Sequence, residues 1–283
     1  MLKRVLVTGA SGQLAHFIVR AFADREVIAY TRSSLDITNP EEVRRTVAAA
    51  KPDVIVNCAA FNDVDGAEAA PMDAFASNAL ALRSLARAAE DAGATLIHYS
   101  SDFVFDGSAT EPYDDDAPPA PRSTYAASKL VGEWLALDAP KALVLRVESL
   151  FGSPSGWTGR RGTLDAIVNG LRQGRDVRVF RDRVVSPSYT PDVAAATRHL
   201  VDVGAAPGVY HCMNGGQATW EQVAQEAARV LGVTPRLQPI TMDQVQLKAA
   251  RPKYCALATR KLTAAGFIMP SWQDALRRWL TAT

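Results

Sequence analysis

The chain has 283 residues, and its 31 lysines and arginines are almost balanced by 30 aspartates and glutamates. This near-neutral charge excludes an electrostatic footprint for nucleic acid or for an anionic membrane surface. The three cysteines are odd in number and follow no metal or redox spacing, so we expect reduced thiols. No apolar run approaches the roughly 18 residues of a spanning helix, and the N-terminus lacks a signal-peptide core. We therefore expect a cytoplasmic protein.

The chain opens with a pattern typical of dinucleotide binding. Residues 3–8 form a short, valine-rich run that suits a buried strand of a parallel sheet. A turn that contains Gly9 and Gly12 follows, and a helix is expected from there to about Ala23. Glycines let the backbone turn tightly, so that a pyrophosphate can rest on the free N–H groups of the helix N-terminus. Because the turn lies between a strand and a helix, we predict a dinucleotide site.

The second strand, Val27 to Tyr30, leads to the residue that should distinguish NADPH from NADH. Arg32 lies 20 residues after Gly12, and Ser33 and Ser34 follow it. An acid at this distance would bind a ribose 2′-hydroxyl, whereas an arginine suits a 2′-phosphate. We therefore expect NADPH, with NADH as the second possibility; the alternative is that Arg32 is a solvated loop residue. The next helix should start at Pro40 with Asn39 as its N-cap.

Two further strands should bring polar residues to the same edge of the sheet. Residues 53–57 form the third strand; Ala59 and Ala60 follow, small enough for a cofactor to pass, and 61–65 are expected as a loop. A helix is expected over 75–92, with a structural role for Asn78. The fourth strand, 95–99, leads to Ser101, and we interpret His98 as a core histidine. The acids Asp114 to Asp116 and the prolines from Pro118 to Pro121 predict a solvated surface loop, in preference to a metal site.

Tyr125 and Lys129 carry the predicted proton chemistry. They stand four residues apart on a helix expected to run to about Leu137, which places both side chains on one face. A phenol has a pKa of about 10, and an ammonium one turn away should lower it. Ser101 adds a hydroxyl able to hold a carbonyl oxygen. The three side chains together predict a carbonyl reductase, whereas the Tyr–Lys pair alone also fits a chance pair on a solvated helix.

The rest of the chain completes an α/β pattern. A fifth strand is expected over 142–147, further strands over 177–180 and 208–211, and helices over 191–201, 219–231 and 271–280. Arg160 and Arg161 lie in a loop and either bind a phosphate or face water. The alternation predicts a Rossmann-type doubly wound parallel sheet with a smaller, mixed C-terminal domain. We expect the dinucleotide-binding domain at 1–152 with return segments near 181–212, and the substrate-binding region at 153–180 and 213–283.

These motifs, in this order, resemble the extended short-chain dehydrogenase/reductase family and, within it, the dTDP-4-dehydrorhamnose reductases. The resemblance covers nearly all of the chain and is carried by the segments TGASGQLA, LDIT, CAAFNDVDGAE, YSSDFVFDG, YAASKLVGE, LRVESLFG, SPSYTPDVA, RPKYCAL and PSWQDAL. It implies reduction of the C4 ketone of a nucleotide-linked 4-keto-6-deoxy sugar, for deoxysugar and polysaccharide biosynthesis. From the balanced charge we expect no nucleic-acid or membrane partner, and we expect either a monomer or a homodimer.

The resemblance assigns roles residue by residue. It implies that Ser101, Tyr125 and Lys129 are catalytic, and that Tyr125 and Lys129 also contact the cofactor. The other expected cofactor contacts are Gly9, Gly12, Gln13, Leu14, Arg32, Asp36, Ile37, Ala59, Ala60 and Asn62. The expected substrate contacts are Ser101, Asp102, Phe103 and Arg251.

Several positions depart from the family pattern. Ala15 stands where a third glycine is usual, Ser101 replaces a threonine and Phe103 replaces a tyrosine. Residues 148–150 lack a tryptophan expected near Ser149. Some members bind magnesium through a glutamate just after the glycine turn; here that region contains His16, so no metal is predicted.

Three alternatives remain open at this stage. One is a related sugar-nucleotide epimerase or dehydratase, although a dehydratase places an acid pair beside the serine and Asp102-Phe103 does not supply one. The others are a non-catalytic cofactor-binding regulatory subunit and a redox-sensing protein on the same fold. Both are disfavoured by the intact residues Ser101, Tyr125 and Lys129.

Overall fold

The structure is a computed structural model that describes residues 4–154, 156–159 and 162–282. Arg160 and Arg161, which were expected either to bind a phosphate or to face water, lie outside the described residues. No helix in the described ranges is both long and apolar enough to cross a lipid bilayer.

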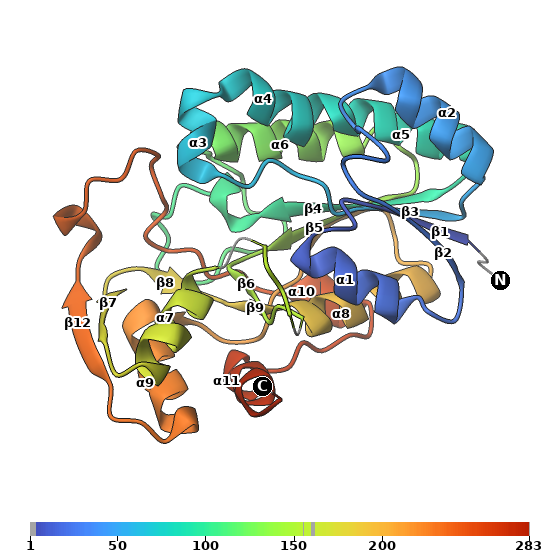
Figure 1. The fold of residues 1–283 in the computed structure, drawn as a ribbon. Helices are drawn as coiled ribbons and strands as arrows, with labels where there is room; N and C mark the ends of the chain where they lie inside the picture. The colour runs from blue at the N-terminus through green and yellow to red at the C-terminus, as the bar shows by residue number, and fades with distance from the viewer. Residues whose placement is uncertain (1–3, 155, 160–161, 283) are drawn as a thin grey trace.

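Six parallel strands form the central sheet in the order β2-β1-β3-β4-β5-β10 (Figure 1). The middle strands are buried along most of their length because helices cover both faces, which explains their Val-, Ile- and Leu-rich sequences. The strands are β1 (Arg4–Thr8), β2 (Glu26–Tyr30), β3 (Val54–Asn57), β4 (Thr95–Ser101), β5 (Ala142–Val147) and β10 (Gly208–His211). The doubly wound parallel sheet predicted from the sequence is confirmed.

Helices cover the two faces of this sheet in separate layers (Figure 1). One layer contains α1 (Gln13–Ala21) and α8 (Thr190–Asp202), which share a hydrophobic core with β1, β3 and β5. The opposite layer contains α2 (Pro40–Ala50), α5 (Ala81–Ala92) and α6 (Thr124–Ala136). The predicted start of α2 is confirmed, because the Asn39 side chain accepts hydrogen bonds from the amides of Glu41 and Glu42.

The helix expected over 75–92 is more complex than the sequence indicated. It consists of α4 (Pro71–Phe75), a π-helical turn over Ala76–Leu80, and α5. The irregular turn lies against α6 at Gly132, where a methyl group in place of the glycine hydrogen would come 2.0 Å from the Asn78 carbonyl oxygen. Local propensity contains no signal for such a contact between helices. The loop expected over 61–65 is also partly wrong, because α3 (Val64–Ala69) begins inside it.

The acidic segment after β4 is not the fully solvated loop that we predicted. Asp115 is only 6% exposed, and its carboxylate accepts hydrogen bonds from the backbone amides of His211 and Lys261. Its neighbours Asp114 and Asp116 form ion pairs with Arg260 and Lys261. The segment therefore anchors the C-terminal part of the chain on the sheet edge, a long-range role that the local sequence could not indicate.

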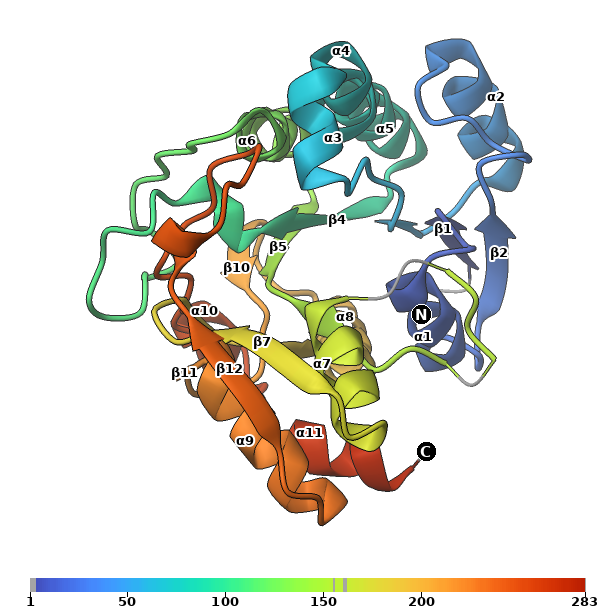
Figure 2. The same cartoon turned by 60° about the vertical axis from the view of Figure 1, so that its left-hand side comes forward.

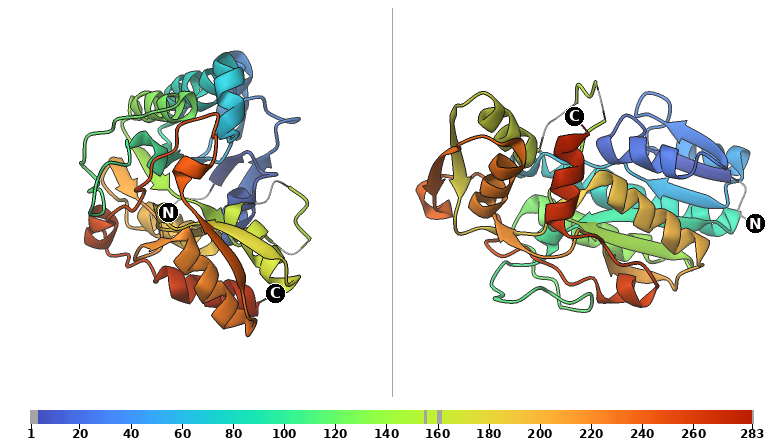
Figure 3. Two further views of the ribbon diagram at one scale, coloured as in Figure 1. Left: turned by 90° about the vertical axis from the view of Figure 1, so that its left-hand side faces the viewer. Right: turned by 90° about the horizontal axis from the view of Figure 1, so that it is seen from below.

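A smaller lobe has its own hydrophobic core, built around Trp220, Leu276 and the helices beside them. Its helices are α7 (Thr163–Arg172), α9 (Trp220–Leu231) and α11 (Trp272–Thr281). The parallel pair β7 (Asp176–Phe180) and β12 (Arg236–Ile240) lies at its outer side (Figure 2). Helix α11 crosses at the junction of the two lobes in the view from below (Figure 3).

The remaining short elements were not expected, because two-residue strands and single helical turns are too short to show a periodic sequence pattern. They are β6 (Leu150–Phe151) with β9 (Ser188–Tyr189), β8 (Val184–Val185) with β11 (Ala218–Thr219), α10 (Arg260–Ala264), and 3₁₀ turns at Asp102–Val104 and Met242–Gln244.

Candidate active site

A cavity of about 510 Å³ opens at the carboxyl ends of β1, β3, β4 and β5. Its size falls in the range of small-molecule sites, and its place is where open α/β sheets bind ligands. Both lobes contribute to its walls: Tyr125 and Lys129 come from the sheet domain, whereas Trp157, Leu164 and Trp220 come from segments of the smaller lobe or leading to it.

The structure brings the three predicted catalytic residues together in this cavity. Ser101 ends β4, and Tyr125 and Lys129 lie in the first turns of α6, which is capped by the Ser123 side chain. All three are at most 7% exposed. The Ser101 hydroxyl donates to Asp102 Oδ1 over 2.9 Å, and the Lys129 ammonium donates to the carbonyl of Tyr99 over 2.5 Å.

The electrostatics of Tyr125 differ from the sequence expectation. Burial raises the pKa of the phenol above its usual value, the negative charge of Asp102 raises it further, and hydrogen bonding with Ser101 opposes both. Burial lowers the pKa of Lys129 to about 8, although the negative charge of the nearby Glu133 carboxylate acts to raise it. The expected lowering of the Tyr125 pKa by Lys129 is therefore wrong for this structure: the cost of desolvating a phenolate dominates, and the ammonium is directed to Tyr99.

The glycine turn forms one wall of the cavity. Gly9 has a φ of +64°, and a methyl group on it would come 2.6 Å from the amide nitrogen of Ala59, so the turn packs directly on the end of β3. Gly12 precedes α1 without a side-chain cap, which leaves backbone N–H groups at the helix N-terminus available to an anion. The side-chain nitrogen Nε2 of Gln13 is also buried without a hydrogen-bond partner among the described residues. These features fit a dinucleotide pyrophosphate.

The predicted cofactor contacts divide into two groups. Eight of them line the cavity: Gly12, Gln13, Leu14, Ala59, Ala60, Asn62, Tyr125 and Lys129. Gly9 lies behind this wall, and three others lie after β2, outside the cavity lining. Of these three, Arg32 is exposed, the Asp36 carboxylate accepts hydrogen bonds from the amide and hydroxyl of Thr38, and Ile37 is a core residue. Arg32 lies near enough to Asp36 to help lower the pKa of its carboxyl, after the larger effect of Thr38.

All of the predicted substrate contacts line the cavity: Ser101, Asp102, Phe103 and Arg251. The Phe103 ring meets the Tyr125 ring edge to face at 5.6 Å between centroids. Arg251 is held by both carboxylate oxygens of Asp65 at 2.9 and 2.8 Å, and this pairing lowers the pKa of Asp65 to about 2. Asp65 lies on α3, the helix that the sequence did not predict.

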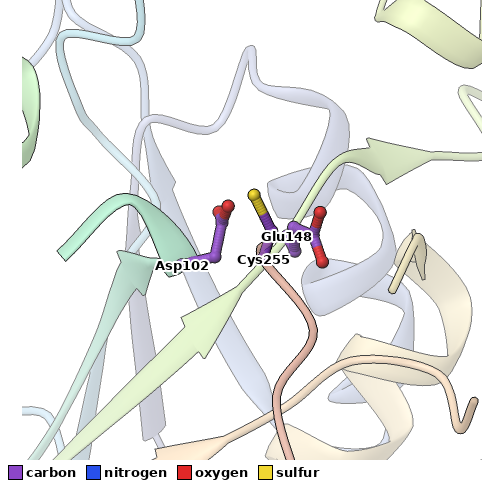
Figure 4. A group of neighbouring side chains, drawn as sticks. All are labelled: Asp102, Glu148 and Cys255. Atoms are coloured by element: carbon purple, nitrogen blue, oxygen red, sulfur yellow. The ribbon is translucent and has the colours of Figure 1, made fainter. Parts of the chain in front are cut away.

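Two charged residues near the cavity had no role in our sequence interpretation. Arg183 lines the cavity, is 8% exposed and lies 5.4 Å from the centre of the Phe103 ring. Glu148 is 2% exposed and lies close to Asp102 and Cys255 (Figure 4). These residues come from segments far apart in the chain, so no spacing could have indicated that they meet.

Comparison with known proteins places these features in a family. A model of the RmlD substrate binding domain matches residues 3–283. A probable dTDP-4,6-dihydroxy-2-methyloxan-3-one 4-ketoreductase from Streptomyces antibioticus is 38% identical over 97% of this chain and 93% of its own. A dTDP-4-dehydrorhamnose reductase from Mycobacterium tuberculosis is 37% identical over 99% of this chain and 93% of its own. The crystal structure of dTDP-4-dehydrorhamnose reductase from Bacillus anthracis in complex with NADP is 30% identical, with a TM-score of 0.93 and full coverage of both chains.

Proposed function

Because the chain belongs to the RmlD substrate-binding-domain family of extended short-chain dehydrogenases/reductases, we propose that it is an NADPH-dependent reductase of nucleotide-linked sugars. Its substrate is the C4 ketone of a dTDP-linked 4-keto-6-deoxy sugar, and its product enters deoxysugar and polysaccharide biosynthesis. The observation that carries the proposal is the meeting of Ser101, Tyr125 and Lys129 in one cavity with the uncapped glycine turn.

In the proposed mechanism, this chain supplies orientation and a proton. When bound, NADPH supplies the hydride that reduces the ketone carbon. Tyr125 donates its phenolic proton to the oxygen on which negative charge develops, and the Ser101 hydroxyl binds the same oxygen. Lys129 adds a buried positive charge on the same face of α6.

The cofactor and the nucleotide sugar should contact different walls of the cavity. The pyrophosphate of the cofactor fits the N-terminus of α1, next to Ala59 and Ala60. On the opposite side, Asp102, Phe103 and Arg251 face the nucleotide sugar. Residues 1–152, with the return segments near 181–212, would thus hold the cofactor, and residues 153–180 and 213–283 would close on the substrate.

All of the residues named here belong to one chain, and we expect the protein to be a monomer or a homodimer. The three described cysteines are free thiols, which supports a cytoplasmic location.

A dehydratase is the second candidate, because the fold brings an acid pair beside Ser101 after all. Asp102 directly follows β4 and Glu148 directly follows β5, and their carboxylates lie in one cluster. Elimination of water from a sugar requires both acids to reach the substrate. Glu148, however, is not among the residues that line the cavity. This geometry favours the reductase.

The decisive experiment is a screen of dTDP-4-keto-6-deoxy sugars with the purified chain, with NADPH oxidation followed by absorbance and the C4 stereochemistry of the product determined by NMR. We expect oxidation of NADPH that depends on the sugar nucleotide and is absent with the free sugar. Conversion of a dTDP-hexose to a 4-keto-6-deoxy sugar without net NADPH oxidation would instead identify a dehydratase.

A further inference from the structure

A cluster of buried side chains lies at the cavity wall, to which it contributes Asp102 and Arg183. Asp102, Glu148 and Cys255 come from three distant segments, and their oxygen and sulfur atoms lie within 4.8 Å of one another (Figure 4). The guanidinium of Arg183 borders the same cluster, with Nη2 3.7 Å from Cys255 Sγ. All four side chains are at least nine-tenths buried.

The charges of this cluster do not balance when both acids are ionised. Two carboxylates face one guanidinium, which leaves an excess negative charge in a region shielded from water. Asp102 Oδ2 and Glu148 Oε1 are also buried without a hydrogen-bond partner among the described residues. A bound metal ion would balance the charge, but the guanidinium of Arg183 already lies against the thiol. One proton on the carboxyl pair removes the excess charge and needs no further ligand.

The surroundings of the pair support the same protonation state. The Ser186 amide donates to Glu148 Oε2, and the charges that act on the two acids are their own and that of Arg183. Burial raises the pKa of Asp102 to about 6 against the opposing effect of Arg183. Burial, followed by the charge of Asp102, raises the pKa of Glu148 well above its usual value.

The pair is connected to the candidate proton donor. Ser101 donates its hydroxyl proton to Asp102 Oδ1, and Ser101 and Tyr125 line the same cavity. The charge of Asp102 raises the pKa of Tyr125, so protonation of the pair directly affects the phenol. Ser101 is therefore the side chain through which the cluster can exchange a proton with Tyr125.

We propose that Asp102 and Glu148 share one proton and return it to Tyr125 through the Ser101 hydroxyl after each reduction. The inference rests on the proposed reductase function. After Tyr125 has given its proton to the substrate oxygen, the phenolate takes the proton of Ser101, and Ser101 takes the proton of the carboxyl pair. One O–H bond breaks at the acid pair and one forms at Tyr125, while Ser101 is unchanged. The ionised pair then takes a proton from water, and no oxidant or reductant is consumed.

Glu148 is a positioning residue in this scheme, because it acts on Tyr125 only through Asp102 and Ser101. In Glu148→Gln the like-charged neighbour of Asp102 is lost while Arg183 remains, so Asp102 ionises at neutral pH and holds no proton. The first turnover should lose much less than the steady state, because it uses the proton already on Tyr125 and feels only the effect of the ionised Asp102 on the pKa of that phenol. Steady-state turnover should fall by about tenfold, less than the roughly 10²–10⁴ that a general acid contributes.

The test compares single-turnover NADPH oxidation, with enzyme in excess, against steady-state kcat over a range of pH. The steady-state rate of Glu148→Gln should recover as the pH is lowered and Asp102 is protonated again. Glu148→Asp should restore most of the rate. Cys255→Ala opens the same cluster without removing an acid and should leave both rates within about twofold. Equal losses in single-turnover and steady-state rates for Glu148→Gln, or no loss in either, would overturn the relay.

Infrared spectroscopy tests the shared proton without any substrate. The wild-type protein at pH 7.5 should show the carbonyl band of a protonated carboxyl group, and this band should be missing from Glu148→Gln. A difference spectrum without this band would refute the shared proton. Because the measurement requires no turnover, it stands even where no sugar nucleotide is reduced, so failure of the inference and failure of the proposed function are distinguishable.

Discussion

Asn78 offers a strong test of how the fold supports the site. Its side chain is fully buried, accepts a hydrogen bond from the Phe61 amide at 2.8 Å, and donates to the Phe61 carbonyl and to Ser128 Oγ at 3.0 Å each. Asn78→Ala leaves both backbone groups of Phe61 unpaired. At about 1–3 kcal/mol for each, and with water reaching the half-buried Phe61, we expect a loss of about 2–4 kcal/mol in the free energy of unfolding.

For a chain of this size, such a loss lowers the melting temperature by roughly 3–7 °C. Asn62, next to Phe61, lines the cavity, so the KM for NADPH should rise more than kcat falls. Asn39→Ala is the matched control, because it removes an exposed N-cap at a cost of about 1 kcal/mol and lies outside the site. A normal melting temperature with a kcat loss of roughly 10² or more would show that Asn78 acts in the chemistry, and our reasoning would be wrong.

Four further predictions concern the site and the helix that carries it. Tyr125→Phe should lower kcat by roughly 10²–10⁴ and leave NADPH affinity within a few-fold; near-normal turnover would remove Tyr125 from the mechanism. Arg32→Ala should raise the KM for NADPH by about tenfold and leave the KM for NADH nearly unchanged, because a charged hydrogen bond to a 2′-phosphate contributes about 1.5–3 kcal/mol. An equal rise in KM for both cofactors would show that Arg32 is only a solvated loop residue. Gly132→Ala should destabilise the protein by roughly 1–3 kcal/mol, since the new methyl would meet the Asn78 carbonyl at 2.0 Å, and a raised melting temperature would contradict this. Burial lowers the pKa of Lys129 to about 8 from 10.5, so between these pH values the unfolded chain binds more protons than the folded chain. The free energy of unfolding of the wild type should therefore increase with pH over this range, relative to that of Lys129→Met. A difference between the two proteins that does not change with pH would refute this prediction.

The parts of the fold that the sequence predicted are those with a local cause. The buried strand Ala142–Val147 is an apolar run interrupted only by Arg146, and its predicted bounds match β5. The start of α2 at Pro40 follows from Asn39, whose side chain satisfies two amides at the helix N-terminus. In each case, neighbouring residues determine the structure, so a single sequence contains the information.

The parts that it missed depend on contacts between distant segments. The π-helical turn at Ala76–Leu80 meets Gly132 on another helix, and no periodicity within the turn marks it. Asp115 appears in the sequence as one of three consecutive acids, yet the fold buries it against the amides of His211 and Lys261. The same limit applied to Glu148 and Arg183, which meet Asp102 only when β4, β5 and the segment before β8 come together.

The short helix α3 shows how such long-range contacts also arrange the site. Asp65 holds Arg251 on the cavity wall and accepts the amide of Ala249. One turn further along, Glu68 accepts the amide and hydroxyl of Thr124 at 2.8 and 2.9 Å. Thr124 is the first residue of α6 and directly precedes Tyr125. Two acids on one face of α3 therefore fix both the arginine proposed to face the sugar nucleotide and the start of the helix that carries the proton donor, so a shift of α3 would disturb both walls of the cavity at once.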